Sequence, residues 1–252
     1  MAIIRGVTSG SGVGSPDRNR ITFEVLAAFA LATTVAAVLY RVPALDSWFH
    51  VIVAALFLYL PAWLLRHHDL ERYGLHARPL GRNLLLFAVC VLVVFPPFAL
   101  GFVAWERLAC AIGWLHRLAP AACGLVTHAG LRLPPAMLSL DPRHNLILAE
   151  LVVVALPEEF FFRGYVQGRL TEAWAPRWRL LGAPVGGALV VSSALFALTH
   201  VAVQGNPATL AVFFPGLVFG WMRARSGSIL PGVLFHASCN LYIETLHRSL
   251  FG

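Results

Sequence analysis

Apolar residues are gathered into long runs along this chain, and short polar stretches separate the runs. Several runs approach the roughly 20 residues that a helix needs to cross a bilayer. They show no sustained alternation of apolar and polar positions, so the pattern favours a helical bundle over a barrel. We expect seven spanning helices, with approximate bounds 21–40, 47–65, 83–104, 145–169, 183–203, 208–222 and 229–246.

Two parts of the chain do not fit this pattern. Residues 1–20 are polar and rich in Gly and Ser, which predicts a disordered N-terminal tail. Residues 105–144 mix short apolar runs with arginines and a Pro-Pro pair. We expect an interfacial helix and a loop there, while an eighth, hidden span stays open. The predicted fold is an all-α transmembrane bundle of seven or eight helices with a polar cavity, and residues 21–252 form a single transmembrane domain.

Composition also indicates a membrane protein. Of 252 residues, 58% are hydrophobic and 12% are charged, about half of the ~25% charged share of a soluble domain. The mean hydropathy is +0.73. The net charge of +7 comes from 19 arginines without any lysine, placed around the ends of the apolar runs. This placement is typical of membrane-flanking charge, so we expect the lipid bilayer, and no nucleic acid, as a partner.

The distribution of the arginines predicts an orientation. With Arg163 left out because it lies within a span, twelve arginines fall on the side of the N-terminus and six on the other. Cytoplasmic loops carry the excess of positive residues, so we expect a cytoplasmic N-terminus. The use of arginine alone suggests a GC-rich bacterium, and the expected location is a bacterial cytoplasmic (inner) membrane.

Four cysteines are too few and too scattered for a disulfide framework. Cys110 and Cys123 share one segment, and we expect them not to pair. Neither a Cys-x-x-Cys nor a His-Glu-x-x-His motif indicates a zinc site. We therefore expect no cofactor.

The stretch Leu156–Arg163 places two carboxylates and a guanidinium inside apolar sequence. Each such side chain costs roughly 2.5 kcal/mol or more near a bilayer centre, so it should be paired or face a wet cavity. Glu159 and Arg163 stand one helical turn apart and can form an ion pair, whereas Glu158 lies on a different face. Glu158 is then left to project into a cavity as a proton acceptor. The alternative is a charge cluster that only ties helices together.

Two further polar motifs lie within expected spans. Phe196 and His200 are one turn apart on one helix, and His236 and Asn240 are one turn apart on another. Each motif alone is weak evidence, because a lone buried histidine is more often a core residue and a lone asparagine can join helices. Together with the glutamates, the motifs supply a base for water and donors for an oxyanion, the parts of a hydrolytic site.

The order Glu-Glu-x-x-x-Arg, Phe-x-x-x-His, His-x-x-x-Asn on late membrane helices resembles the CAAX protease and bacteriocin-processing (CPBP, or ABI) family of glutamic-type intramembrane endopeptidases. The resemblance covers roughly residues 148–246. It implies a bundle of the eight-helix type with a water-filled cavity and metal-independent hydrolysis. It also implies site roles at six positions: Glu158 as base with His200 activating water, Glu159 and Arg163 as support, and His236 with Asn240 as the oxyanion hole.

The resulting hypothesis is an intramembrane endopeptidase, with its catalytic helices at about 145–246, that cleaves a membrane-anchored protein or peptide. The substrate signal would be a CAAX-like or sorting sequence near a C-terminus, or a bacteriocin leader. Two alternatives stay open. One is a zinc-dependent membrane protease with Glu158, His200 and His236 as ligands. The other is a non-catalytic membrane binding or immunity protein. The sequence does not indicate an oligomeric state.

Overall fold

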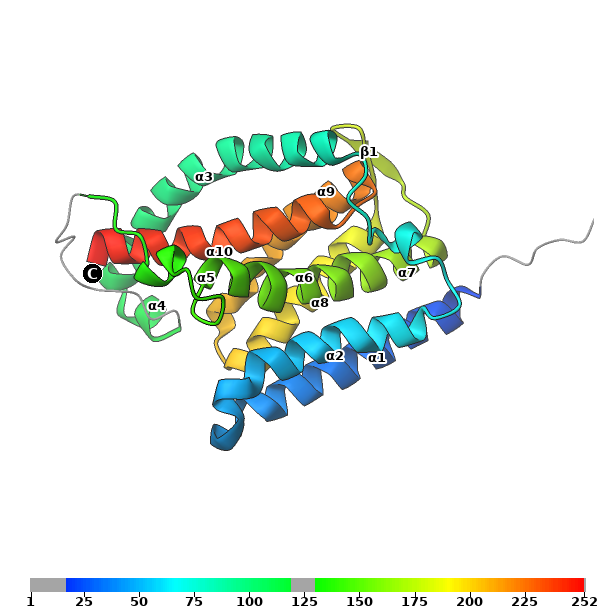
Figure 1. Cartoon of the computed structure of the whole chain (residues 1–252), viewed down its shortest axis with the longest axis horizontal. Helices are drawn as coiled ribbons and strands as arrows, with labels where there is room; N and C mark the ends of the chain where they lie inside the picture. Colours follow the sequence, from blue (N-terminus) through cyan, green and yellow to red (C-terminus); the bar gives the residue numbers. More distant parts are fainter. Residues whose placement is uncertain (1–16, 119–129, 252) are drawn as a thin grey trace, which may run out of the picture.

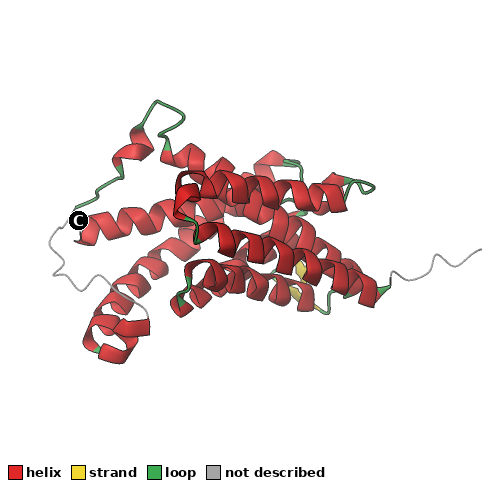
Figure 2. Cartoon of the chain, turned by 90° about the horizontal axis from the view of Figure 1, so that it is seen from below, coloured by secondary structure: helices red, strands yellow, loops and turns green. Residues whose placement is uncertain are grey.

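The structure is a computed structural model, and it describes residues 17–118 and 130–251 of the chain. Most of its long helices run along a common axis, and a small β-hairpin lies at one end of the bundle (Figure 1). Helices make up nearly all of the molecule, also when it is seen from below (Figure 2). The long regular helices are α1 (Arg18–Tyr40), α2 (Phe49–Leu64), α3 (Leu80–Ala111), α8 (Gly187–Gln204), α9 (Phe213–Ser226) and α10 (Leu230–Phe251).

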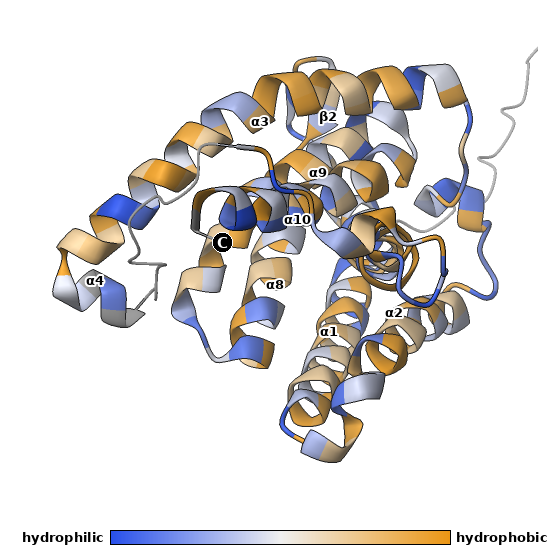
Figure 3. Ribbon diagram, turned by 60° about the vertical axis from the view of Figure 1, so that its left-hand side comes forward, coloured by the Kyte–Doolittle hydropathy of each residue, from blue (hydrophilic) through white to orange (hydrophobic). Residues whose placement is uncertain are grey.

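Five stretches of the described chain are long and apolar enough to cross a membrane, and each matches an expected span. They are Arg18–Tyr40, Pro43–Leu64, Leu80–Ala111, Gly187–Gln204 and Pro207–Ser226. The two other expected spans, 145–169 and 229–246, correspond to residues 146–173 and to α10, which carry the Glu-Glu-x-x-x-Arg and His-x-x-x-Asn motifs. Hydrophobic residues cover much of α3 (Figure 3), and its side chains are mostly exposed, as on a lipid-facing helix. The predicted all-α transmembrane bundle is confirmed.

Residues 146–173 form one continuous helical segment, which we call the central helix. It consists of α5 (Leu146–Leu148), the π-helical η4 (Ala149–Ala155), α6 (Leu156–Glu159), the π-helical η5 (Phe160–Val166) and α7 (Gln167–Ala173). Asn145 caps its start, because its side chain accepts a hydrogen bond from the amide of Leu148 at 2.9 Å. Pro157 cannot donate to the preceding turn, and the wider π turn before it accommodates the missing bond. The segment contacts α1, α2, α8 and α10.

Small side chains let α1 and α8 approach each other closely. Ala28, Ala32 and Ala36 recur every fourth residue on the buried face of α1, which is the spacing that brings membrane helices together. The hydroxyls of Thr33 and Thr199 join the two helices at 2.9 Å. On α8 the small residues Ala188, Ser192 and Ser193 are buried as well.

Short elements connect the helices. They are the 3-10 turns η1 (Pro43–Trp48), η2 (Leu70–Tyr73), η3 (Pro135–Leu138) and η6 (Pro207–Val212), the short α4 (Gly113–Leu118), and the strands β1 (Trp178–Leu180) and β2 (Ala183–Val185).

The two strands form an antiparallel hairpin, with β1 in the expected loop before residue 183 and β2 at the expected start of the fifth span. Its turn residues, Leu181 and Gly182, both have positive φ, 47° and 80°. A two-residue turn of this hand matches the twist of a hairpin. The sequence did not indicate it, because leucine is an unusual residue at a turn position with positive φ. The indole of Trp221 donates to the carbonyl of Leu180 at 2.9 Å and fixes the hairpin on α9.

The segment between the third and fourth spans is partly described. Helix α3 continues to Ala111, well past the expected end at 104, and α4 follows it. Within the described parts of this segment no further long helix occurs, and residues 119–129, the rest of the segment in which an eighth span stayed open, lie outside the described residues. Cys110 is disulfide-bonded, against the expectation, while Cys123 lies outside the described residues, as do residues 1–16 of the expected tail.

Candidate active site

The expected ion pair is present at the centre of the bundle. Glu159 and Arg163 are both completely buried, and Oε1 of the carboxylate lies 3.1 Å from a terminal nitrogen of the guanidinium. Each charge is costly without the other in this setting, since leaving one member of a buried pair alone costs about 3–5 kcal/mol. Because neither side chain is exposed to water, neighbouring protein groups have to stabilise the pair.

Aromatic rings enclose the guanidinium of Arg163. Its carbon lies 4.3 Å from the ring centre of Phe196, 5.0 Å from that of Phe219 and 5.9 Å from that of Phe162. Such cation–π contacts contribute roughly 2 kcal/mol when the cation is desolvated. The guanidinium also donates to the carbonyl of Gly216 at 3.2 Å. The phenylalanine of the Phe-x-x-x-His motif thus supports the arginine of the first motif.

His236 on α10 lies between the two glutamates. Its Nδ1 is 3.1 Å from Oε1 of Glu159, and its Nε2 is 3.7 Å from Oε2 of Glu158. Its ring stacks on Phe219 with centroids 4.8 Å apart. Adjacent glutamates point about 100° apart, so they flank one imidazole rather than share a helix face.

A glycine on α10 makes room for this arrangement. A Cβ at Gly232 would lie 3.0 Å from Oε2 of Glu159. Only a residue without a side chain lets α10 approach the buried carboxylate this closely. Glu159 is thereby held between Arg163, His236 and the backbone of α10.

Glu158 faces a cavity of about 370 Å³ instead of the ion pair. The cavity lies among α1, α2, the central helix, α8 and α10, and its polar lining includes His50, Glu150, Glu158, His200, Gln204 and Asn240. The side chain of Glu158 is 20% exposed, and its Oε2 accepts no hydrogen bond from the described residues. That oxygen is buried and lies 3.7 Å from Nε2 of His236, so it is the remaining, exposed part of the Glu158 side chain that faces the cavity.

His200 lies four residues from the end of α8, yet it lines the same cavity as Glu158. The helices are therefore offset along the bundle axis, because α8 extends only one residue beyond the expected end at Val203. Nδ1 of His200 lies 2.9 Å from the carbonyl of Phe196. A carbonyl only accepts, so Nδ1 carries the proton and Nε2 of the neutral ring is a lone-pair acceptor.

Asn240 lines the cavity, and its amide donates to Oε2 of Glu150 at 2.7 Å. Sequence reasoning missed Glu150, although an acid two turns before Glu158 in an apolar run is a usable signal. It also missed His50, which stands alone at the start of α2 and carries no such signal. His236, by contrast, is not among the residues that line the cavity. Its expected place in an oxyanion hole stays a prediction.

Metal binding is the other chemistry that these side chains could support. Among residues 17–118 and 130–251, no group of three or more His, Cys, Asp or Glu side chains is arranged to hold a metal ion. His236 approaches both glutamates, whereas His200 lies within ion-pair distance of no described carboxylate. Glu158, His200 and His236 are therefore not gathered around one point.

The fold and the site define a polytopic helical membrane protein that encloses a buried ion pair and a polar cavity. Residues 144–242 match the family model of the Rce1-like type II CAAX prenyl endopeptidases, which supports the resemblance to the CAAX protease family. The match includes all six residues predicted for the site and indicates a protease. Comparison with curated proteins gave no match. Comparison with solved structures gave none either.

Proposed function

We propose that this protein is an intramembrane endopeptidase in which Glu158 activates water. The observation that carries the proposal is the environment of Glu158, whose side chain lines the cavity. Its neighbour Glu159 is instead bound to Arg163 and His236. A general base must reach the proton it removes, and only Glu158 of the two acids reaches the cavity.

The side chains around the cavity suit the steps of peptide hydrolysis. Glu158 takes a proton from a water molecule as the water oxygen attacks the scissile carbonyl carbon, and Nε2 of His200 holds the second proton of that water. The amide of Asn240 donates to the developing oxyanion. When the C–N bond breaks, the proton on Glu158 passes to the leaving nitrogen. No covalent intermediate is needed.

The proposed substrate is a membrane-anchored protein or peptide with a processing signal near one end. The cavity is built from membrane-spanning helices, and about 370 Å³ is within the range of sites that enclose part of a ligand. The proposed setting is a bacterial cytoplasmic membrane, in which a segment of the substrate enters the cavity from the bilayer or its surface.

Cleavage assays with the purified protein in proteoliposomes test this function. We expect cleavage within a panel of membrane-anchored peptides that carry CAAX-like, leader-type and sorting-type ends. Glu158→Gln should reduce turnover by at least about a hundredfold, since a positioned base contributes about 10²–10⁴. Glu71→Gln is the matched control, because Glu71 is exposed in η2. If the panel is not cleaved and processing in cells is insensitive to Glu158→Gln, the protein is a binding or immunity protein.

Metal dependence separates this mechanism from that of a zinc protease. We expect turnover to survive dialysis against a strong chelator. If the active protein instead contains stoichiometric zinc, and its turnover is lost when the chelator removes the zinc and returns when zinc is added back, Glu158 and the histidines are metal ligands.

A further inference from the structure

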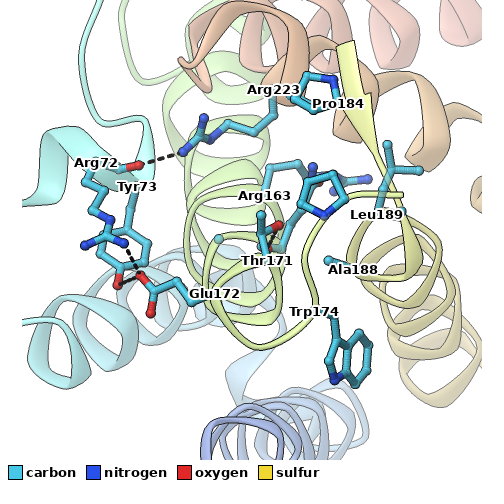
Figure 4. Close-up of a pocket in the computed structure, with 15 residues that line it drawn as sticks. Arg72, Tyr73, Arg163, Thr171, Glu172, Trp174, Pro184, Ala188, Leu189 and Arg223 are labelled. Carbon is cyan, nitrogen blue, oxygen red and sulfur yellow. Dashed lines mark hydrogen bonds and ion pairs between the residues drawn. The ribbon is translucent and has the colours of Figure 1, made fainter. Parts of the chain in front are cut away.

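A second cavity, of about 310 Å³, lies at the other end of the central helix. Figure 4 shows it between α7, the β-hairpin and the end of α9, with Arg72 and Arg223 on one side and Trp174 on another. It shares no lining residue with the cavity of Glu158. It is therefore a separate cavity, although Arg163, the partner of Glu159, reaches its wall.

Arg223 carries an unbalanced charge on the wall of this cavity. Its terminal nitrogen donates to the backbone carbonyl of Arg72 at 2.8 Å, while its Nε is buried and has no hydrogen-bond partner among the described residues. No described carboxylate lies within ion-pair distance of it. Gly74 leaves room for the guanidinium, since a Cβ there would lie 2.6 Å from Nε.

The other charges at the cavity are already balanced. Glu172 binds Arg169, accepts a hydrogen bond from Tyr73 at 2.7 Å and lies 3.5 Å from Arg72. Burial, with Glu172 beside it, raises the pKa of Tyr73 to about 12, so this phenol stays protonated and keeps donating. Arg163 also reaches the wall, but Glu159 neutralises it. The cavity is left with a net positive charge centred on Arg223.

The surroundings match a membrane-surface position. The cavity lies where the arginine-rich connections gather, since Arg82 also donates to the backbone of Arg225 at this end of the bundle. Tyr73 and Trp174 line it, and both are residue types that accumulate at the level of lipid head groups. The guanidinium of an arginine can donate two parallel hydrogen bonds to a phosphate group. Basic pockets between membrane helices bind anionic lipid head groups.

We propose that this cavity binds a phosphate group through Arg223, with Arg72 at its edge. The phosphate belongs to the head group of an anionic phospholipid or is free in solution. Either source supplies oxygens to the guanidinium of Arg223, which has no carboxylate within ion-pair distance among the described residues. The cavity of about 310 Å³ is far larger than a single water molecule needs.

Thermal unfolding of the full-length protein in neutral detergent tests the proposal. The probes are phosphatidylglycerol, phosphatidylcholine and inorganic phosphate, each titrated separately. We expect saturable stabilisation by phosphatidylglycerol and little by phosphatidylcholine, whose choline offsets the charge. If inorganic phosphate stabilises as well, free phosphate is a sufficient ligand. If it does not, the ligand is the lipid. If neither phosphatidylglycerol nor phosphate stabilises the protein, the proposal is wrong.

Substitutions assign the effect to the cavity. Arg223→Gln should raise the phosphatidylglycerol concentration for half-maximal stabilisation at least tenfold, and Arg225→Gln, two residues away and outside the lining, should leave it unchanged. Thr171 is exposed at the cavity wall, so we expect its replacement to leave the fold intact. Thr171→Glu should weaken binding as strongly as Arg223→Gln, while the neutral Thr171→Gln should not. Equal effects of the Glu and Gln variants, or of the two arginine variants, would overturn the assignment.

Discussion

At the scale of single residues, the site separates two adjacent acids into different environments. Glu159 is fully buried and bound to Arg163 and His236, whereas the side chain of Glu158 is 20% exposed and lines the cavity. The imidazole of His236 joins them, so a change in either acid alters the orientation of the ring. The proposed base is thus held in place by groups that do not themselves face the cavity.

Asn240 is the residue whose proposed role is most open to a kinetic test. Asn240→Ala should lower turnover by roughly a hundredfold or more, because it removes one donor to the oxyanion. The fold should change little, since Glu150 is half-buried at the cavity and can be rehydrated there. Turnover and the thermal unfolding midpoint are measured on the same preparation. Unchanged turnover would contradict the donor role, and a large loss of stability would assign Asn240 to helix packing.

At the scale of elements, the spans were predictable because length and apolar composition are local properties of the chain. The Glu159–Arg163 pair was predictable for the same reason, since both residues lie on one helix. The contact of Asn240 with Glu150 was not, because the two residues are 90 positions apart and meet only through the register of α10 against the central helix. The position of His236 between two carboxylates depends on the same register.

Close helix approach at Gly232 gives an element-scale prediction. Gly232→Ala should lower the free energy of unfolding by about 1–3 kcal/mol, the usual cost of overpacking, because its Cβ would press on the carboxylate of Glu159. Gly101→Ala on α3 is the matched control, since nothing lies within 4 Å of a Cβ there. That change should be neutral or stabilising, as alanine favours a helix more than glycine does. Denaturant titration of both variants makes the comparison. Equal effects would show that α10 does not depend on this contact.

At the scale of the whole molecule, two cavities occupy opposite ends of the bundle. The cavity of Glu158 lies near the turn between α1 and α2, where Phe49 and His50 line it. The cavity of Arg223 lies at the arginine-rich end, close to η2. With the expected cytoplasmic N-terminus, the phosphate cavity faces the cytoplasm and the cleavage site lies nearer the outer surface.

Thiol labelling in intact cells tests this orientation. Ser47→Cys in η1 should react with a membrane-impermeant maleimide, because the α1–α2 turn is expected outside. Ala77→Cys, which is exposed in the loop before α3, should react only after the cells are permeabilised. The protein without added cysteine corrects for its native thiols. The opposite pattern would place the N-terminus outside and reverse the assignment of both cavities.

The central claim is that Glu158 is the base and Glu159 a structural charge, and paired measurements of stability and turnover on two variants test it most directly. Glu158→Gln should fold with nearly the stability of the unmodified protein and lose turnover. Glu159→Gln leaves Arg163 buried without its counter-ion, so it should lose about 3–5 kcal/mol of unfolding free energy together with its activity. If Glu158→Gln is the unstable variant while Glu159→Gln is stable and inactive, the base is Glu159 and the claim is wrong.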